Sequence, residues 1–340
     1  MKKNTHTNKQ EKKVFFIAEA GVNHNGKLKN ALKLIDIASK AGADAIKFQT
    51  WKTDLLMTKV TKTTLYQKKN TKYKSQYEMA KKLELKYDEF LSLKNYCNKR
   101  NIMFLSTADD FESADFLRNL QEIFKIGSGE INNYPFLKYI GSFKKKIILS
   151  TGISTMSEIK KATDTLLIAG TKKNNITLLH CNSEYPSPYE DINLLAMKSI
   201  QDKFKLNVGY SDHSLGTEVS IAAVALGAVV IEKHFTFNTE AIGPDHKSSI
   251  GPKELKKLIN SIRIVEKSLG NSIKKPTKSE IKNINSIRKS IVAKNNICKG
   301  DIFDENNLTV KRPGTGKSPM MWLKIMGKKA NKNYKKNDFI

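Results

Sequence analysis

The feature that most constrains this chain is a unit of structure that repeats along its first two-thirds. From Val14 to about Phe235, a short run of β-branched or aromatic residues is followed by a polar turn and then by a helical pattern, and the unit recurs eight times. Apolar residues at three- and four-residue spacing predict amphipathic helices between the strands. The helices include Leu28–Ala41, Tyr87–Lys99 and Met156–Ala169, and the predicted strands are Val14–Glu19, Ala45–Gln49, Ile102–Thr107, Ile123–Ser128, Lys146–Thr151, Ile176–Cys181, Leu206–Ser211 and Val229–Phe235.

Strict alternation of strands and helices predicts a parallel sheet, because a parallel connection needs a crossover long enough to hold a helix. Eight units favour closure into an α/β TIM (β/α)8 barrel, and a doubly wound open sheet is the alternative. The segment Thr50–Tyr77 departs from the pattern, since it is too long for an ordinary strand-to-helix loop. It lies where barrel active sites are built, so we expect it to shape or cover a site.

The 340 residues divide into a large domain and a small one. We expect the barrel to span residues 14–270, a polar, lysine-rich linker to span 271–285, and a compact β-rich module to span 286–340, where short runs such as SIVA and NLTV alternate with turn signals. The opening residues 1–13 are basic and polar but lack the apolar stretch of a secretory signal, which predicts a disordered tail.

Two further features bear on where the protein works. The longest apolar run, Val219–Ile231, is shorter than the roughly 20 residues needed to cross a bilayer. The three cysteines, Cys97, Cys181 and Cys298, are too widely spaced to indicate a disulfide framework or a structural zinc site. We therefore expect a cytoplasmic protein without a membrane partner.

The net charge of +27 is compatible with nucleic-acid binding, since basic surfaces concentrate polyanions. The positive residues are almost all lysines scattered through the predicted helices and loops, with arginine at only five positions. Bidentate recognition of bases and phosphates favours arginine. We therefore interpret the charge as a solvated, lysine-biased surface and expect no nucleic-acid partner.

Polar and ionisable residues follow the predicted strands at their carboxyl ends, where the chemistry of a TIM barrel is located. Side chains two residues apart share one face of a strand, so Lys47 and Gln49 point one way, as do Glu232 and His234. A lumen lined by such residues is a poor core and a good anion site. The strand ends carry Glu19, Lys47, Gln49, Ser106, Thr107, Lys125, Ser128, Glu130, Ser150, His180, Ser211, Asp212, His213, Glu232 and His234.

Lys47 and Lys125, with nearby hydroxyls and the small turn Gly127–Glu130, favour a phosphate pocket. The alternative is that Lys125 merely ends an exposed strand. His213 and His234 end consecutive predicted strands, so we expect them to be neighbours that bind a divalent metal, although each alone could be a structural histidine.

The segment Ala18–Gly26 places Glu19 at the end of the first predicted strand, where we interpret it as a general acid or base. Its glycines lack the GxGxxG spacing, so a dinucleotide site is weakly indicated. His24 is either a site residue or a turn residue.

Nine motifs between Phe15 and the C-terminus point to one family: EAGVNHNG, IKFQTWK, FKIGSGEINNYP, ILSTG, LLHCNSEYPSPYEDINL, GYSDHS, IEKHF, GPDH and VKRPGTG. With these motifs in this order, the chain closely resembles the bacterial N-acetylneuraminate (sialic acid) synthases and their legionaminate and pseudaminate relatives. The resemblance implies a TIM barrel followed by a small antifreeze-like (SAF) domain. It also implies a domain-swapped homodimer, in which the SAF domain reaches the active site of the partner.

The resemblance implies a phosphoenolpyruvate-dependent transferase. Such an enzyme condenses phosphoenolpyruvate with N-acetylmannosamine, or with a 2,4-diacetamido-2,4,6-trideoxy-hexose, and with water, giving a nonulosonic acid and phosphate by C–O cleavage. The implied cofactor is a divalent metal, Mn²⁺ or else Mg²⁺ or Co²⁺. The implied roles are phosphoenolpyruvate binding by Lys47, Thr107, Lys125, Ser128, Ser150 and Ser211, metal binding by His213 and His234, catalysis by Glu19, Glu130, Lys47 and Lys125, and sugar binding by Gln49, Tyr185, Asp245 and Arg312.

One departure leaves the accepted amino-sugar open. Most members of the family carry STPFD after the third strand, whereas this chain has STADD at Ser106–Asp110, with Asp109 in place of an aromatic residue. Two alternatives are more distant. A synthase that uses a phosphorylated aldose would need a second basic pocket, for which no arginine cluster is visible, and a non-catalytic protein that binds polyanions or carbohydrate would account for the charge alone.

Overall fold

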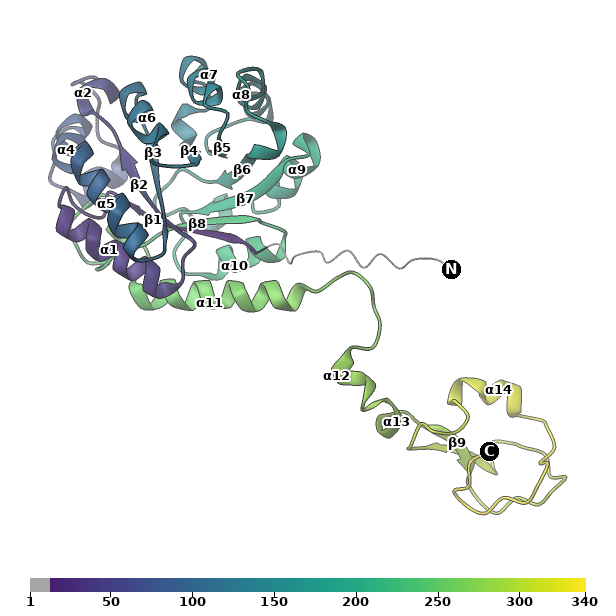
Figure 1. Ribbon diagram of the computed structural model, residues 1–340. Coiled ribbons are helices and arrows are strands. Elements are labelled where there is room, and N and C mark those ends of the chain that lie inside the picture. Colours follow the sequence, from purple (N-terminus) through teal and green to yellow (C-terminus); the bar gives the residue numbers. More distant parts are fainter. Residues whose placement is uncertain (1–12) are drawn as a thin grey trace. The chain divides into compact units, whose positions relative to one another are not determined.

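The computed structural model describes residues 13–340 and contains a closed parallel barrel whose eight strands follow chain order (Figure 1). The strand β8 pairs with β1 and closes the ring. The TIM-barrel prediction is confirmed, the open-sheet alternative is wrong, and the predicted strand ends lie within two residues of the observed ones. The strands are β1 (Phe15–Gly21), β2 (Ala45–Thr50), β3 (Met103–Ala108), β4 (Ile123–Ile126), β5 (Lys146–Ser150), β6 (Ile176–Cys181), β7 (Asn207–Asp212) and β8 (Val230–His234). Residues 1–12, which make up nearly all of the predicted basic tail, lie outside the described residues.

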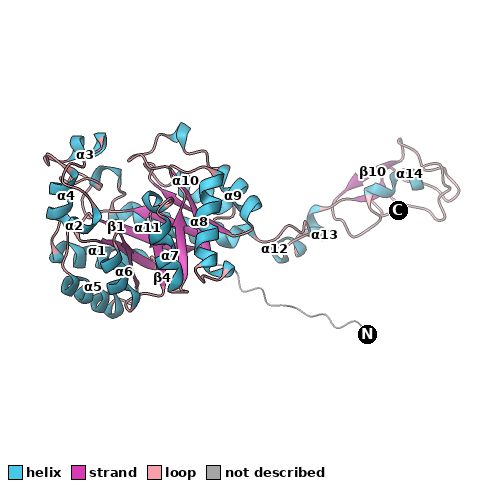
Figure 2. Cartoon of the chain, turned by 90° about the horizontal axis from the view of Figure 1, so that it is seen from above, coloured by secondary structure: helices cyan, strands magenta, loops and turns pink. Residues whose placement is uncertain are grey.

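Helices surround the strands and bury their apolar faces on the outside of the barrel (Figure 2). Local sequence fixes their ends. The first helix ends at Gly42, which adopts the left-handed conformation (φ 87°) that glycine reaches without strain. Thr155 and Glu158 form a capping box at the start of α8. The main helices are α1 (Leu28–Ala41), α5 (Tyr87–Lys99), α6 (Phe111–Arg118), α7 (Tyr134–Ser142), α8 (Met156–Ile168), α9 (Ala196–Phe204), α10 (Glu218–Ala225) and α11 (Pro252–Leu269).

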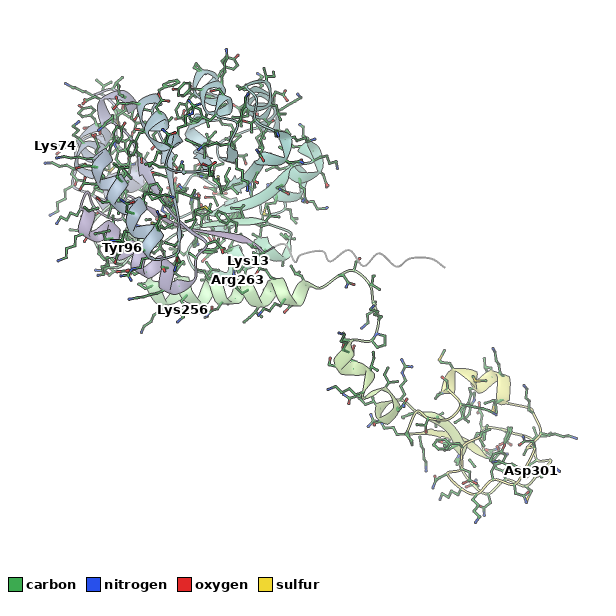
Figure 3. All side chains as sticks on the ribbon, viewed as in Figure 1. Lys13, Lys74, Tyr96, Lys256, Arg263 and Asp301 are labelled. Carbon is green, nitrogen blue, oxygen red and sulfur yellow. The ribbon has the colours of Figure 1, made fainter. Side chains whose placement is uncertain are left out.

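The last helix of the barrel, α11, ties the end of this unit to its beginning. It packs against α1 and α10. Arg263 donates a hydrogen bond to the carbonyl of Val14 (2.8 Å) and forms an ion pair with Asp44 (2.5 Å). Lys13 pairs with the same carboxylate and lies beside Arg263 in Figure 3. The ends of the barrel segment are thus held together by charge as well as by packing.

The long connection after β2 folds into short helices instead of an open loop. They are α2 (Thr53–Leu56), α3 (Leu65–Asn70) and α4 (Gln76–Leu83). Trp51, Met79 and Leu83 pack with Val22 in a small apolar cluster of their own. Asn70 donates a hydrogen bond to the carbonyl of Pro244 (3.0 Å), in the loop after β8. The insertion therefore crosses the barrel mouth from β2 toward β8.

The lumen of the barrel changes from apolar to polar along each strand. One layer is apolar and packs into a separate cluster, whose members are Ile17, Ala45, Leu105, Ile148, Leu179 and Val230. Because side chains alternate with a period of two residues, the next lumen-facing position lies two residues further along each strand, toward its carboxyl end. Those positions are polar, so the apolar layer forms the floor on which the site is built.

The second compact unit, Asn271–Ile340, has its own apolar core, which includes Ile291, Phe303 and Tyr334. Two short strands, β9 (Ser290–Ala293) and β10 (Leu308–Lys311), pair antiparallel. The helices are α12 (Lys278–Ile281), α13 (Ile284–Ile287) and α14 (Trp322–Ile325), so the stretch predicted as a linker contains helical turns.

The lysines of the surface point into solvent, as Lys74 in the insertion and Lys256 on α11 do in Figure 3. Both side chains are exposed. Among residues 13–340, no helix is both long enough and apolar enough to cross a membrane.

Two histidines are buried where the loop after β1 meets the loop after β8. His24 accepts a hydrogen bond from the amide of Gly26 (3.0 Å), and its Nε2 atom has no partner among the described residues. His246 bonds Thr236 through Nδ1 (2.6 Å) and Asn25 through Nε2 (3.2 Å). Burial lowers the pKa of each ring to about 4, and for His24 the charge of His246 adds to the effect. Both imidazoles are therefore neutral in the folded protein.

We predict that acid weakens the fold through this pair. Between pH 6.5 and about 4 an unfolded histidine takes up a proton while His24 and His246 do not, so the free energy of unfolding falls as the pH is lowered through this window. The expected loss at pH 5 is about 2 kcal/mol for each ring, hence about 4 kcal/mol for the pair. Urea unfolding followed by circular dichroism should give a steeper pH dependence for the wild type than for the double variant His24→Asn, His246→Asn. Equal slopes would contradict this account.

Candidate active site

The barrel residues that the sequence analysis selected lie together at the carboxyl ends of the strands or in the loops directly after them. The polar layer of the lumen stands two residues beyond the floor on each strand, and its members are Glu19, Lys47, Thr107, Lys125, Ser150, Cys181, Ser211 and Glu232. All of them are buried. The two-residue alternation of the strands thus delivers one polar side chain per strand to a single ring.

Two lysines share this ring with two carboxyl groups. Lys47 Nζ lies 2.6 Å from Glu19 Oε2 and 3.7 Å from Glu232 Oε2, and it donates a hydrogen bond to Thr107 (3.1 Å). Lys125 Nζ lies 3.1 Å from Glu232 Oε1. The Lys125 side chain is only 6% exposed, so the alternative that it merely ends an exposed strand is wrong.

The two carboxyl groups differ in protonation. Burial raises the pKa of Glu19 to about 8, because the attraction of Lys47 offsets only part of the desolvation. Burial also disfavours the charged form of Glu232, but Lys125, Lys47 and the hydroxyl of Ser211 hold its pKa at about 2. The ring therefore joins two lysines to one acidic partner that they share, Glu232, while burial favours the neutral form of Glu19, an arrangement that suits an anion.

Hydroxyl groups, and a backbone amide that lies close to one of them, complete the cradle around the lysines. Ser211 donates a hydrogen bond to Glu232 (2.9 Å), and Ser150 is buried at the end of β5. Ser128, in the short 3₁₀ helix Ser128–Glu130, accepts a hydrogen bond from the amide of Gly152 (3.0 Å). A Cβ atom at Gly152 would lie 2.4 Å from the Ser183 oxygen and 2.8 Å from the Ser128 oxygen, so a larger residue there would displace these hydroxyls. Hydroxyls and amides of this kind bind phosphate oxygens.

The two histidines expected to be neighbours are neighbours. The ring centroids of His213 and His234 lie 5.4 Å apart. His213 Nδ1 contacts the carbonyl of Asn182, and His213 Nε2 faces the hydroxyl of Tyr185 at 3.1 Å. Burial lowers the pKa of His213 to about 4, and burial together with His213 lowers the pKa of His234 well below its ordinary value. Both rings are thus in the neutral form that binds metals.

The histidines are the residues best suited to hold a metal ion. His234 Nδ1 is buried and has no hydrogen-bond partner among residues 13–340. Within the same residues, no group of three or more His, Cys, Asp or Glu side chains is arranged to hold a metal. A metal bound here would therefore need ligands from water or substrate in addition to the two imidazoles.

An aromatic stack covers the histidines. The ring of Tyr185 stacks on His213 (4.1 Å between centroids) and meets His234 edge-on (5.5 Å). Tyr66, on α3 of the insertion, stacks on Tyr185 from the other side (5.4 Å). The insertion thus covers the mouth of the barrel, as its length and position indicate.

A cavity of about 200 Å³ lies beneath this cover. Three of the four residues expected to place a sugar, Gln49, Tyr185 and Asp245, line it together with His234. Burial raises the pKa of Asp245 to about 6. The rest of the wall is supplied by Val22, Trp51, Leu56, Met57, Tyr66, Gln67, Gln76, Met79, Ala80, Leu83, Asp109 and Pro244.

The remaining expected site residues are placed as follows. Glu130 lies on the 3₁₀ helix after β4 and accepts a hydrogen bond from Asn133 (2.5 Å). Arg312 belongs to the second unit, where its Nε donates to the carbonyl of Ile287 (3.0 Å). Glu232 was not assigned a role from sequence, although it stands two residues before His234 on the same face of β8 and could have been found by that alternation. Asn182, which contacts His213 through its backbone, carried no such signal.

Comparisons with known proteins agree with this geometry. The NeuB family matches residues 34–274, and the SAF domain matches residues 288–340. The N,N'-diacetyllegionaminic acid synthase of Campylobacter jejuni is 53% identical over 331 residues, which cover 97% of this chain and 99% of that protein. The N,N'-diacetyllegionaminic acid synthase of Legionella pneumophila is 44% identical, over 94% of this chain and 91% of that protein.

Among solved structures, the N-acetylneuraminic acid synthetase of Leptospira borgpetersenii, in complex with citrate, superimposes with a TM-score of 0.72. It is 36% identical, over 81% of this chain and 91% of that one. The expectations of a sialic acid synthase-type enzyme and of a C-terminal SAF domain are both confirmed. The chain therefore belongs to the NeuB family.

Proposed function

We propose that this protein condenses phosphoenolpyruvate with an N-acylated amino-sugar aldehyde and water, giving a nonulosonic acid and phosphate by C–O cleavage. The observation that carries this proposal is the arrangement at the barrel mouth. Lys47 and Lys125 both contact Glu232 on β8, which shares one face of that strand with His234, and His213 lies beside His234. The relatives named as N,N'-diacetyllegionaminic acid synthases favour a 2,4-diacetamido-2,4,6-trideoxy-hexose as the acceptor. N-acetylmannosamine is the alternative, as is the acceptor of a pseudaminate synthase.

The ring is suited to bind phosphoenolpyruvate, whose phosphate and carboxylate are both anionic. Lys47 and Lys125 would neutralise this charge, and the hydroxyls of Thr107, Ser128, Ser150 and Ser211 would donate hydrogen bonds to the oxygens. Glu232 already holds the two lysines in place through ion pairs. The phosphate would stay in this cradle until it leaves, so positioning and electrostatics would supply much of the rate.

The two imidazoles fit a divalent metal, Mn²⁺ being our first choice and Mg²⁺ or Co²⁺ the others. Both rings are neutral, both lie at the mouth, and His234 Nδ1 is a buried nitrogen without a partner among the described residues. Such a metal would act as a Lewis acid toward the oxygen of the sugar aldehyde. Gln49, Tyr185 and Asp245 would orient the sugar within the covered cavity.

The bond changes follow from this placement. The methylene carbon of phosphoenolpyruvate attacks the aldehyde carbon, and the positive charge left at the enol-ether carbon is captured by water. The tetrahedral product of that addition expels phosphate. Glu19, whose pKa near 8 keeps it protonated at neutral pH, is suited to give a proton to the developing alkoxide, and Glu130 is suited to accept one from the attacking water.

The family resemblance further suggests that the enzyme is a cytoplasmic, domain-swapped homodimer. In that arrangement Arg312 of one subunit would contact the amino-sugar in the other. A phosphorylated aldose is less suitable as the acceptor, because the residues that line the cavity beneath the insertion include no lysine or arginine.

Turnover by the pure protein is the first test. With Mn²⁺ and phosphoenolpyruvate we expect phosphate release with the 2,4-diacetamido sugar or with N-acetylmannosamine. Lys125→Met, which removes one ammonium group from the cradle, should raise the KM for phosphoenolpyruvate at least about tenfold, since a hydrogen bond to a charged group is worth about 1.5–3 kcal/mol. The matched control Lys256→Met, on the exposed face of α11, should leave it unchanged. Absence of phosphate release with both sugars would overturn the proposal.

The metal role is tested by binding as well as by rate. We expect His234→Gln to weaken Mn²⁺ binding, measured by titration calorimetry, by at least about tenfold while the fold is kept. The matched control is His180→Gln, because His180 is a histidine on β6 whose Nε2 contacts the carbonyl of Ile192. Equal Mn²⁺ affinity in the two variants would remove the assigned role.

For the SAF domain we predict that Arg312→Ala raises the KM for the sugar several-fold and leaves the KM for phosphoenolpyruvate within about twofold, because arginine is proposed to contact only the sugar. Steady-state kinetics with each substrate varied in turn measures both constants. Lys317→Ala, an exposed lysine of the same domain, serves as the control. A change confined to phosphoenolpyruvate would contradict the cross-subunit assignment.

A further inference from the structure

Asp109 is held in a fixed position at the end of β3. Its amide donates a hydrogen bond to the carbonyl of Thr50 (3.1 Å), on the neighbouring strand. The next residue, Asp110, caps α6 through Ser113 (2.7 Å) and accepts a hydrogen bond from the amide of Lys52 (2.7 Å). The backbone on both sides of the Asp109 side chain is therefore fixed before any ligand arrives, which is what a recognition residue requires.

The side chain of Asp109 lines the cavity beneath the insertion and has no hydrogen-bond partner among residues 13–340. Burial, and then the charge of Glu130, raise the pKa of this carboxyl to about 7, while Lys47 acts in the opposite direction. Asp109 is only half-buried, and a ligand that filled the cavity would take water away from its oxygens, which is costly unless the ligand supplies a hydrogen bond. A ligand that donates a hydrogen bond to Asp109 would remove that cost.

The same cavity offers two other kinds of contact. Gln49 and Gln76 line it, and their side-chain amides carry N–H donors. An apolar wall, which we name the insertion wall, is formed by Trp51, Leu56, Met57, Met79, Ala80 and Leu83. His234 also lines the cavity, and the insertion wall comes from the long connection after β2.

We propose that the part of this cavity lined by Asp109 and the insertion wall is the subsite for the acylamino group on C4 of the sugar, with Asp109 accepting its N–H and the insertion wall packing against its methyl group. The inference rests on the proposed function. It adds that the substituent on C4 decides which sugar the enzyme accepts. The glutamine amides can donate to the acyl carbonyl, so the N–H, the carbonyl and the methyl each meet a suitable partner.

Other substituents fit less well. A phosphate is excluded because the lining contains no cationic lysine or arginine and already includes the carboxyl groups of Asp109 and Asp245. A hydroxyl would satisfy Asp109 but would leave the insertion wall without an apolar partner. N-acetylmannosamine has a hydroxyl at C4, so the subsite discriminates against it and in favour of the 2,4-diacetamido sugar.

The test compares Asp109→Leu, which removes the acceptor, with Asp109→Asn, which keeps an acceptor oxygen in the same place. The KM values for the 2,4-diacetamido sugar, for N-acetylmannosamine and for phosphoenolpyruvate are measured with Mn²⁺ present. We expect Asp109→Leu to raise the KM for the diacetamido sugar at least about tenfold, and Asp109→Asn to stay within about threefold of the wild type. The KM for N-acetylmannosamine should change less than threefold in both variants, and that for phosphoenolpyruvate less than twofold. Asp202→Leu, on the exposed face of α9, is the matched control.

The outcomes separate this inference from the proposed function. If the wild type uses neither sugar, the proposed function fails. If the wild type prefers N-acetylmannosamine, or if Asp109→Leu affects both sugars equally or neither, the synthase activity stands and the C4 subsite is overturned. Should Asp109→Leu not fold, Asp109→Asn with a C4-propionamido analogue replaces it. If the subsite has an apolar wall, the KM for this analogue should lie within about tenfold of the KM for the diacetamido sugar. A larger rise in KM would contradict the subsite.

Discussion

The interaction on which the site depends is the pair of ion contacts that Glu232 makes with Lys47 and Lys125 inside the barrel. Placing two ammonium groups in a buried lumen is expensive unless an opposite charge and hydrogen bonds accompany them. Glu232 provides that charge, and Ser211 and Thr107 provide hydrogen bonds. A single carboxylate contacts both lysines, and burial favours the neutral form of Glu19, so the ring favours a further negative charge. An anionic substrate can supply that charge.

The outer face of the same strands carries a second buried ion pair. Lys233, between Glu232 and His234, points away from the lumen and pairs with Asp212 at 3.0 Å, and both side chains are fully buried. Asp212 also accepts hydrogen bonds from Ser214 and Ser220. Since Asp212 directly precedes His213 and Lys233 directly precedes His234, this contact fixes β7 and β8 to each other just behind the two imidazoles. Their separation is therefore set by a contact on the other side of the sheet.

Most of the fold and most of the lumen residues could be predicted from the sequence, for a physical reason. Strand periodicity is local, so the alternation that predicts β2 also predicts that Lys47 and Gln49 share a face. Contacts between distant segments have no such signal. The stacking of Tyr66 on Tyr185 joins residues from an insertion without periodicity to a loop far along the chain, and the direction of the Asp109 side chain depends on its backbone bond to Thr50. The proposed role of Arg312 came from resemblance alone, because it belongs to another compact unit.

The apolar floor of the barrel, formed by residues such as Ile17, Leu105 and Val230, has a consequence for how such a protein can diversify. Within the lumen, apolar packing lies toward the amino-terminal half of each strand, whereas the candidate site occupies the carboxyl-terminal half. A replacement at the rim, for example at Asp109, leaves that apolar floor unchanged. Enzymes with this barrel can accordingly change which sugar they prefer by exchanging single residues at the rim. The apolar packing that stabilises the barrel stays unchanged.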